Sequence, residues 1–141
     1  MRSFDAARER PAPSSFAGVT LDGNAVTHTF EGRTLVVAVK TMCDGCRDFV
    51  NSTLDELDNV TVLIVSGTDD PDGEWVNARQ QVLVAPELLK ELDIKWPPFY
   101  VLVDGLRRQV VSEGVVFGPS QVALEIAPYL TARDVTGPHQ S

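Results

Sequence analysis

The chain has 141 residues, of which 43% are apolar, and it carries a formal net charge of -8 at pH 7. This length is enough for one well-filled core and too short for two ordinary domains. The acidic balance argues against a nucleic-acid partner, because binding a phosphate backbone needs clustered Lys and Arg side chains.

Neither a membrane span nor a signal peptide is visible in the sequence. Every apolar run is shorter than the roughly 20 residues that cross a bilayer, and the N-terminal residues lack the hydrophobic core of a leader. Taken as given, the chain is expected to be a soluble, cytoplasmic monomer. A leader or anchor outside the given sequence would instead tether the domain outside the cytoplasmic membrane.

The first elements in chain order are a lead-in, a hairpin and a strand. Residues 1–15 are expected to be flexible, because they have no apolar face. Residues 16–21 and 25–30 flank Asp22-Gly23-Asn24, a combination typical of a β-hairpin. The β-branched run from Thr34 to Val39 then predicts a buried central strand.

Cys43 and Cys46, the two cysteines of the chain, follow this strand and are separated by two residues. They stand where a helix begins, and its free N–H groups and positive dipole end favour a thiolate. A disulfide between them would close a tiny loop, so it would constrain the unfolded chain little. The spacing indicates thiol chemistry instead, with Cys43 as the attacking thiol and Cys46 as the resolving thiol.

The helix is expected to continue to Leu57, since apolar residues recur on one face from Cys46 onward. The pattern after it alternates further strands and helices. The expected strands are residues 60–65, 82–84, 99–103 and 109–116, and the expected helices are residues 74–80, 86–92 and 120–130. Pro128 is expected to bend or end the last helix, and residues 132–141 are expected to form a loose tail.

The order of these elements resembles the thioredoxin superfamily, with Cys43-Asp44-Gly45-Cys46 after the first long strand and a proline directly before residues 99–103. The segments LDGNAV, Gly32-Arg33 and PFYVLVDG are most similar to thioredoxin-like proteins of the cytochrome-maturation and methylamine-utilisation type, which are alkyl hydroperoxide reductase/thiol-specific antioxidant-like. The resemblance implies one α/β domain at residues 16–131, with a central mixed β-sheet flanked by helices and an N-terminal β-hairpin.

The resemblance also implies a function and a set of site residues. Such proteins are thiol-disulfide oxidoreductases of cell redox homeostasis that act on protein thiols and disulfides, with no cofactor. They carry a cis-proline facing the cysteine pair, and the matching residue here is Pro98, after Pro97. Met42, Trp96, Pro97 and Pro98 are therefore expected to bind the substrate.

Three positions depart from the family pattern. Met42 stands where tryptophan is frequent, and Gly45 stands where proline is frequent. Val37 occupies the position of the buried acid of thioredoxin, so proton transfer to Cys46 needs water or another group.

Two other readings of the cysteine pair remain open at this point. A structural zinc site usually has four ligands, whereas this chain adds only His28 and His139 to its two cysteines, so no metal is expected. A redox-inactive binding or scaffold module with the same fold is the alternative to an enzyme. The motif also leaves the direction of electron flow open, because that depends on the reduction potential.

Overall fold

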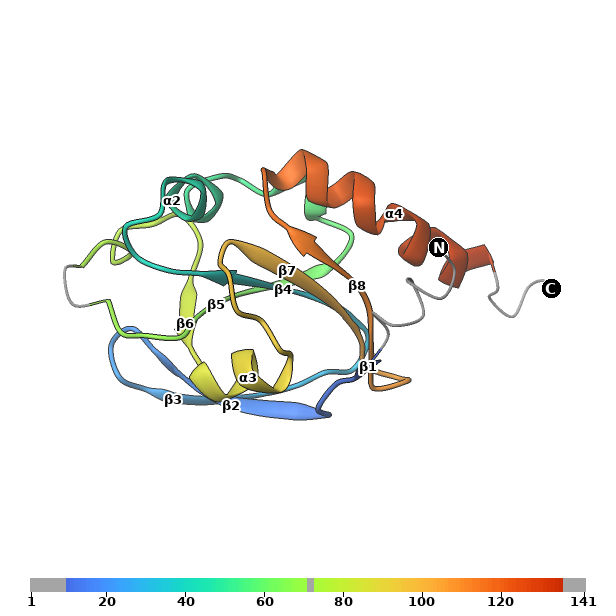
Figure 1. Ribbon diagram of the computed structural model, residues 1–141, viewed down its shortest axis with the longest axis horizontal. Coiled ribbons are helices and arrows are strands. Elements are labelled where there is room, and N and C mark those ends of the chain that lie inside the picture. Colours follow the sequence, from blue (N-terminus) through green and yellow to red (C-terminus); the bar gives the residue numbers. More distant parts are fainter. Residues whose placement is uncertain (1–9, 71–72, 136–141) are drawn as a thin grey trace.

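The protein is described here by a computed structural model, which covers residues 10–70 and 73–135. It contains one eight-stranded sheet in the order β1-β8-β7-β4-β5-β6-β2-β3 (Figure 1). The strands are β1 (Arg10–Pro11), β2 (Ser15–Thr20), β3 (Ala25–Thr29), β4 (Arg33–Val39), β5 (Thr61–Ser66), β6 (Val82–Val84), β7 (Phe99–Asp104) and β8 (Gln109–Val115). β4, β5 and β6 run parallel to one another, and the other neighbouring pairs are antiparallel.

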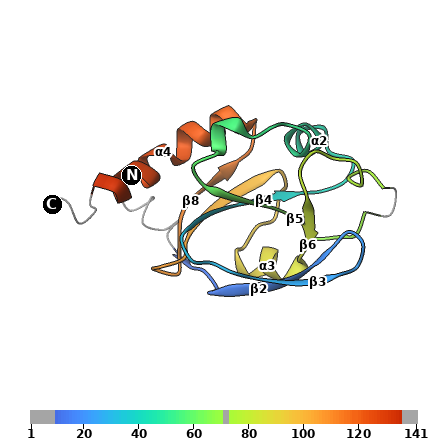
Figure 2. The same cartoon turned by 180° about the vertical axis from the view of Figure 1, so that it is seen from behind.

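Helices cover both faces of the sheet, as the resemblance implied. The helices are α2 (Asp44–Val50), the 3-10 helix η1 (Asp55–Leu57), α3 (Pro86–Glu91) and α4 (Pro119–Val135). α2, η1 and α4 lie on one face and α3 lies on the other (Figures 1 and 2). The fold is thus the expected α/β arrangement with a mixed central sheet and a hairpin, β2–β3, at its N-terminal side.

The central strand β4 divides the core into two layers. Its odd-numbered side chains, Leu35, Val37 and Val39, pack in the cluster that contains residues of α2 and α4, whereas Val36 and Ala38 pack with Leu88 of α3. All five of these β4 side chains are fully buried. A continuous β-branched run is what a strand covered on both faces requires, because successive side chains point to opposite faces.

The lead-in differs from the expectation that residues 1–15 have no buried face. Arg10–Pro11 pairs with β8, and Ala12 is buried. Arg10 also forms an ion pair with Glu113 at 2.7 Å, which anchors this edge strand. Residues 1–9 lie outside the described part of the chain.

Two helices differ in length from the prediction. α2 ends at Val50 instead of Leu57, because Asn51 Nδ2 and Ser52 Oγ donate to the carbonyls of Arg47 and Phe49 and Leu54 takes a positive φ of 60°. α4 continues through Pro128 to Val135, where a tail was expected. Pro128 is exposed, so the carbonyl that lacks its N–H partner can bond water instead. Residues 136–141 lie outside the described part.

The predicted helix at residues 74–80 is a turn. Asp70 accepts hydrogen bonds from the backbone N–H groups of Glu74 and Trp75 at 2.7 and 2.8 Å. Farther along, Gln80 donates its backbone N–H to the carbonyl of Val50 at 2.9 Å, which docks the segment on the end of α2. We call residues 73–80 the docked segment.

Candidate functional site

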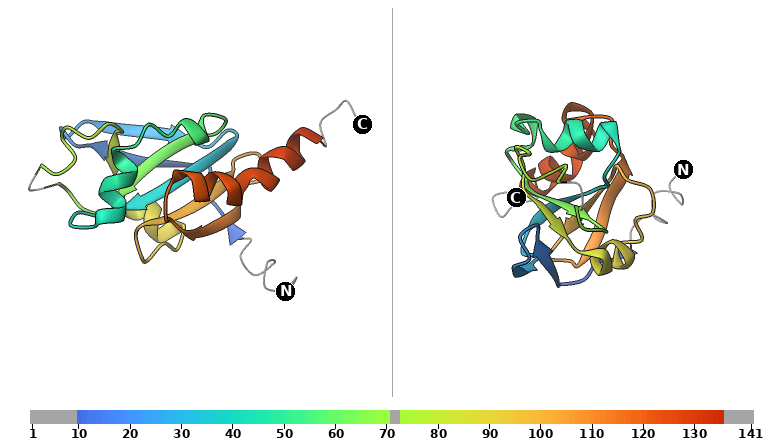
Figure 3. Two further views of the ribbon diagram at one scale, coloured as in Figure 1. Left: turned by 90° about the horizontal axis from the view of Figure 1, so that it is seen from above. Right: turned by 90° about the vertical axis from the view of Figure 1, so that its left-hand side faces the viewer.

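The cysteine pair lies after the central strand, where the chain passes from β4 into α2. Figure 3 shows the ribbon of β4 continuing into that of α2. Cys43 is the N-cap of α2, with extended backbone angles of φ -133° and ψ 114°. Met42, directly before it, has a φ of 60°, in the left-handed region that non-glycine residues rarely adopt. The chain therefore turns sharply just before Cys43.

Cys43 and Cys46 form a disulfide, with their Cα atoms 5.2 Å apart. The two sulfurs differ in their surroundings, because Cys43 is partly exposed whereas Cys46 is fully buried. Each sulfur accepts a backbone hydrogen bond: Cys46 N–H donates to Cys43 Sγ at 3.2 Å, and Lys40 N–H donates to Cys46 Sγ at 3.4 Å. Both donors would stabilise negative charge on a free thiolate.

Pro98, which the resemblance placed opposite the cysteine pair, lies close to the pair in the structure. The Pro97–Pro98 peptide bond is cis. A Cβ atom added to Gly45 would be 3.6 Å from Pro98 Cγ, so Pro98 reaches the turn between the two cysteines. Pro98 also accepts the backbone N–H of Val116 at 3.0 Å, which brings the end of β8 to the same place.

Three large apolar side chains next to these residues are exposed. The exposed fraction is 85% for Met42, 75% for Trp96 and 84% for Phe117. Met42 precedes Cys43, Trp96 precedes the two prolines, and Phe117 follows Val116. We call these three residues the rim. Phe117 was not predicted, because it is 71 residues from Cys46 and nothing in the local pattern marks it.

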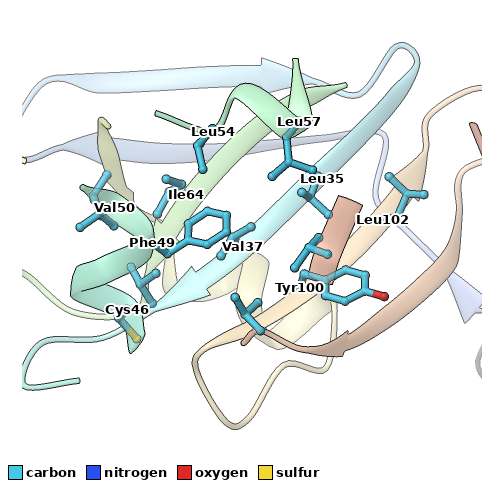
Figure 4. Close-up of a cluster of buried hydrophobic side chains, with 14 of the residues drawn as sticks. Leu35, Val37, Cys46, Phe49, Val50, Leu54, Leu57, Ile64, Tyr100 and Leu102 are labelled. Atoms are coloured by element: carbon cyan, nitrogen blue, oxygen red, sulfur yellow. The ribbon is translucent and has the colours of Figure 1, made fainter. Parts of the chain in front are cut away.

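The side chains beneath the disulfide are apolar and closely packed. Val37, Cys46, Phe49, Trp75 and Tyr100 belong to one buried cluster, and none is more than 2% exposed. We call these five residues the floor. Figure 4 shows Cys46 on α2 among this cluster, with Phe49 and Val37 beside it. Val37 thus offers no carboxylate below the pair, as its identity already indicated.

Charged groups stand beside the pair and come from two elements. Arg47 Nη1 is 2.9 Å from Asp44 Oδ1 within α2, and Arg47 Nε is 3.6 Å from Glu74 Oε2 of the docked segment. Glu74 Oε1 accepts the backbone N–H of Met42 at 3.1 Å. Sequence reasoning missed Glu74, because it is 31 residues from Cys43 and nothing in the local pattern marks it.

The described residues show no metal centre and no bilayer-spanning helix. Within residues 10–70 and 73–135, no three His, Cys, Asp or Glu side chains are grouped so that they could hold a metal ion. His28 packs against Phe16 and Phe30 in the hairpin, and His139 lies outside the described part. No helix in these ranges is long and apolar enough to cross a membrane.

No family model and no curated protein matches this chain. Among solved structures, the thioredoxin domain of a thiol-disulfide oxidoreductase from Bacteroides vulgatus is similar, with 18% identity over 85% of this chain and 95% of that one, at a TM-score of 0.63. An exposed lipoprotein thioredoxin from Streptococcus pneumoniae has 16% identity over 84% and 98%, at a TM-score of 0.60.

A thiol:disulfide interchange protein of the thioredoxin family from Chlorobium tepidum has 20% identity over 86% of this chain and 97% of its own, at a TM-score of 0.62. These likenesses cover nearly the full length of the similar chains. Together with the sheet order and the position of the disulfide, they show that the chain has the thioredoxin-like fold.

Proposed function

We propose that this domain is a thiol-disulfide oxidoreductase that exchanges the Cys43–Cys46 disulfide with a protein partner. The observation that carries the proposal is the asymmetry of the pair, with Cys43 partly exposed at a helix start and Cys46 fully buried. Exchange needs this asymmetry, because one thiolate must reach a partner while the second must reach only the first. The proposal is also supported by two of the similar structures, which are described as a thiol-disulfide oxidoreductase and a thiol:disulfide interchange protein.

The reaction balances without any other reactant. In the reduced domain, the Cys43 thiolate attacks one sulfur of a partner disulfide, the partner S–S bond breaks, and the leaving thiolate takes up a proton. Cys46, after losing its proton, then attacks Cys43 Sγ and releases the second partner sulfur. The partner gains two electrons and becomes a dithiol, whereas the domain becomes the disulfide. The reverse sequence oxidises a partner dithiol.

A backbone N–H group stabilises the Cys46 thiolate, although β4 carries no acid beside it. Negative charge develops on Cys46 Sγ before it attacks, and the Lys40 N–H points at this atom. A hydrogen bond to a charged acceptor is worth roughly twice a neutral one, so this amide favours the thiolate in a buried place. Because Val37 cannot accept the proton of Cys46, water or another group must receive it.

The rim and the two prolines form the surface on which a partner segment binds. Met42, Trp96 and Phe117 expose apolar area next to the disulfide and the two prolines, and Pro98 reaches Gly45 between the two cysteines. Apolar area gathered beside a reactive group is typical of protein-binding surfaces. The partner is therefore a protein that presents a cystine flanked by apolar residues.

A trapping experiment tests this function. A Cys46→Ser variant cannot resolve the mixed disulfide, so incubation with insulin should leave a covalent adduct at Cys43 that mass spectrometry identifies. The Cys43→Ser, Cys46→Ser double variant is the matched control and should form none. If Cys46→Ser forms no adduct and the reduced wild type accelerates no insulin reduction, the domain is a redox-inactive module instead.

A further inference from the structure

We infer that Glu74, from the docked segment, is a positioning residue for Cys43: it holds the Met42 amide and so fixes the backbone from which the attacking cysteine starts. This inference rests on the proposed function. It concerns a residue outside the cysteine motif and outside both elements that the motif joins.

Met42 has an unfavourable backbone conformation that needs other contacts to stabilise it. Its φ of 60° lies in the left-handed region, which is sterically unfavourable for an L-residue other than glycine. The side chain contributes little to hold it, because Met42 is 85% exposed. Such a conformation persists where surrounding contacts determine it. For the residue directly before a nucleophile, a change of φ would redirect the Cys43 side chain.

Glu74 supplies a contact of the required kind. Its Oε1 accepts the Met42 N–H at 3.1 Å, and its Oε2 is buried, with the Arg47 guanidinium as its ion-pair partner at 3.6 Å. The Glu74 side chain is only 16% exposed, so the carboxylate that accepts the Met42 N–H is itself largely shielded from water. One carboxylate thereby joins the residue before Cys43 to the helix after it.

The position of Glu74 is set independently of Met42. Asp70 binds the backbone N–H groups of Glu74 and Trp75, and Trp75 is 2% exposed within the floor. At the other end of the docked segment, Arg79 N–H donates to Asn51 Oδ1 at 3.3 Å and Gln80 Nε2 donates to the Ser52 carbonyl at 2.8 Å. Hydrogen bonds at both ends of the docked segment therefore fix the position of Glu74, which allows Glu74 to fix the Met42 backbone in turn.

Two substitutions separate the hydrogen bond of Glu74 from its charge. Glu74→Gln and Glu74→Ala both remove the negative charge, but only glutamine keeps an oxygen that can accept the Met42 N–H. Glu87→Ala is the matched control, since Glu87 is an exposed glutamate of α3 whose ion pair with Lys90, at 3.9 Å, lies away from the disulfide. Circular dichroism and thermal unfolding establish that each variant is folded.

Two measurements then test the inference. In Glu74→Ala, hydrogen exchange at the Met42 amide should become at least ~10-fold faster, because this amide loses its acceptor. The rate constant for reaction of Cys43 with a model disulfide should fall about 5- to 10-fold, since misplacing a reacting group by about 1 Å can cost up to ~100-fold. Glu74→Gln and Glu87→Ala should stay within about twofold of the wild type in both measurements, if the acceptor is what matters.

Several results would overturn the role of Glu74. These are unchanged Met42 exchange in Glu74→Ala, equal disulfide-exchange rates in Glu74→Ala and the wild type, or a Glu74→Gln variant as impaired as Glu74→Ala. Failure of the proposed function is distinguishable, because the reduced wild type itself would then not react with the model disulfide. In that event the Met42 amide measurement alone decides whether Glu74 fixes the backbone before Cys43.

Discussion

The rim and the floor are both apolar, they border the same disulfide, and they differ in nearly every other respect. The floor side chains are at most 2% exposed, whereas the rim side chains are at least 75% exposed. Burial of apolar area stabilises the fold, and exposed apolar area does not. The floor therefore supports the site, and the rim is available to a partner.

The two regions also come from the chain in different ways. The floor is built mainly from β4, α2 and β7, whose apolar residues follow strand and helix periodicity. Each rim residue lies in a different connection between elements and is largely exposed. This difference predicts that changes in the floor alter stability, whereas changes in the rim alter partner binding.

The largest expected effect is the loss of a floor side chain. Phe49→Ala should lower the free energy of unfolding by about 3–5 kcal/mol, because it removes a fully buried ring and leaves a cavity under Cys46. Urea unfolding measures this loss. Phe117→Ala is the matched rim substitution and should change stability by no more than about 0.5 kcal/mol. Similar losses in both variants would contradict the division between rim and floor.

The rim should affect recognition of a protein substrate. In Trp96→Ser, Phe117→Ser, kcat/KM for insulin reduction should fall by about 10-fold, or about 1.4 kcal/mol, since two exposed apolar contacts with the partner are lost. The rate with a small disulfide such as oxidised glutathione should stay within about twofold, because this molecule has no apolar segment that binds the rim. An equal loss with both substrates would show that these residues act on the cysteines themselves.

The smallest expected effect concerns the hydroxyl group of Tyr100 in the floor. The Tyr100 hydroxyl donates to Glu125 Oε1 at 2.8 Å and lies 3.2 Å from Ser112 Oγ. Tyr100→Phe should lower the free energy of unfolding by about 1 kcal/mol at neutral pH. It should leave the exchange rate of Cys43 unchanged, which a slower rate would contradict.

Tyr100 also gives the floor a pH dependence. Burial, with Glu125 adding to the effect, raises the pKa of Tyr100 from 10.0 to about 12. The unfolded chain therefore loses this proton first, so the contribution is intact below about pH 10 and is lost as the pH rises toward 12. Urea unfolding of the wild type should show this fall relative to Tyr100→Phe, and parallel pH profiles would refute it.

Much of the fold follows from local pattern, and the departures have identifiable causes. The hairpin, β4, β5, β7 and β8 were predicted close to their observed bounds, since long β-branched runs and turn residues are strong signals. The helix after Cys46 was predicted too long, because Asn51 and Ser52 compete for the carbonyls that would continue it. The turn at residues 74–77 depends on Asp70, whose carboxylate gives the backbone N–H groups an alternative to a helix.

The site likewise contains residues that the sequence predicted and residues that it did not. Cys43 and Cys46 are neighbours in sequence at a strand–helix junction, so their pairing could be predicted, and the cis bond before Pro98 was expected from the resemblance and is present. Phe117 and Glu74 could not be predicted. Each lies near the disulfide because of contacts between residues far apart in the chain, and such contacts leave no periodic signal.

By itself, the sequence determined the alternation of strands and helices, the position of the two cysteines at a helix start, and the absence of an acid at residue 37. These properties depend on residue type and short spacing. Only the tertiary structure decided which apolar side chains border the disulfide and which distant carboxylate holds the residue before Cys43. The reason is physical: burial and long-range hydrogen bonds are set by how the elements pack, and a linear pattern does not record packing.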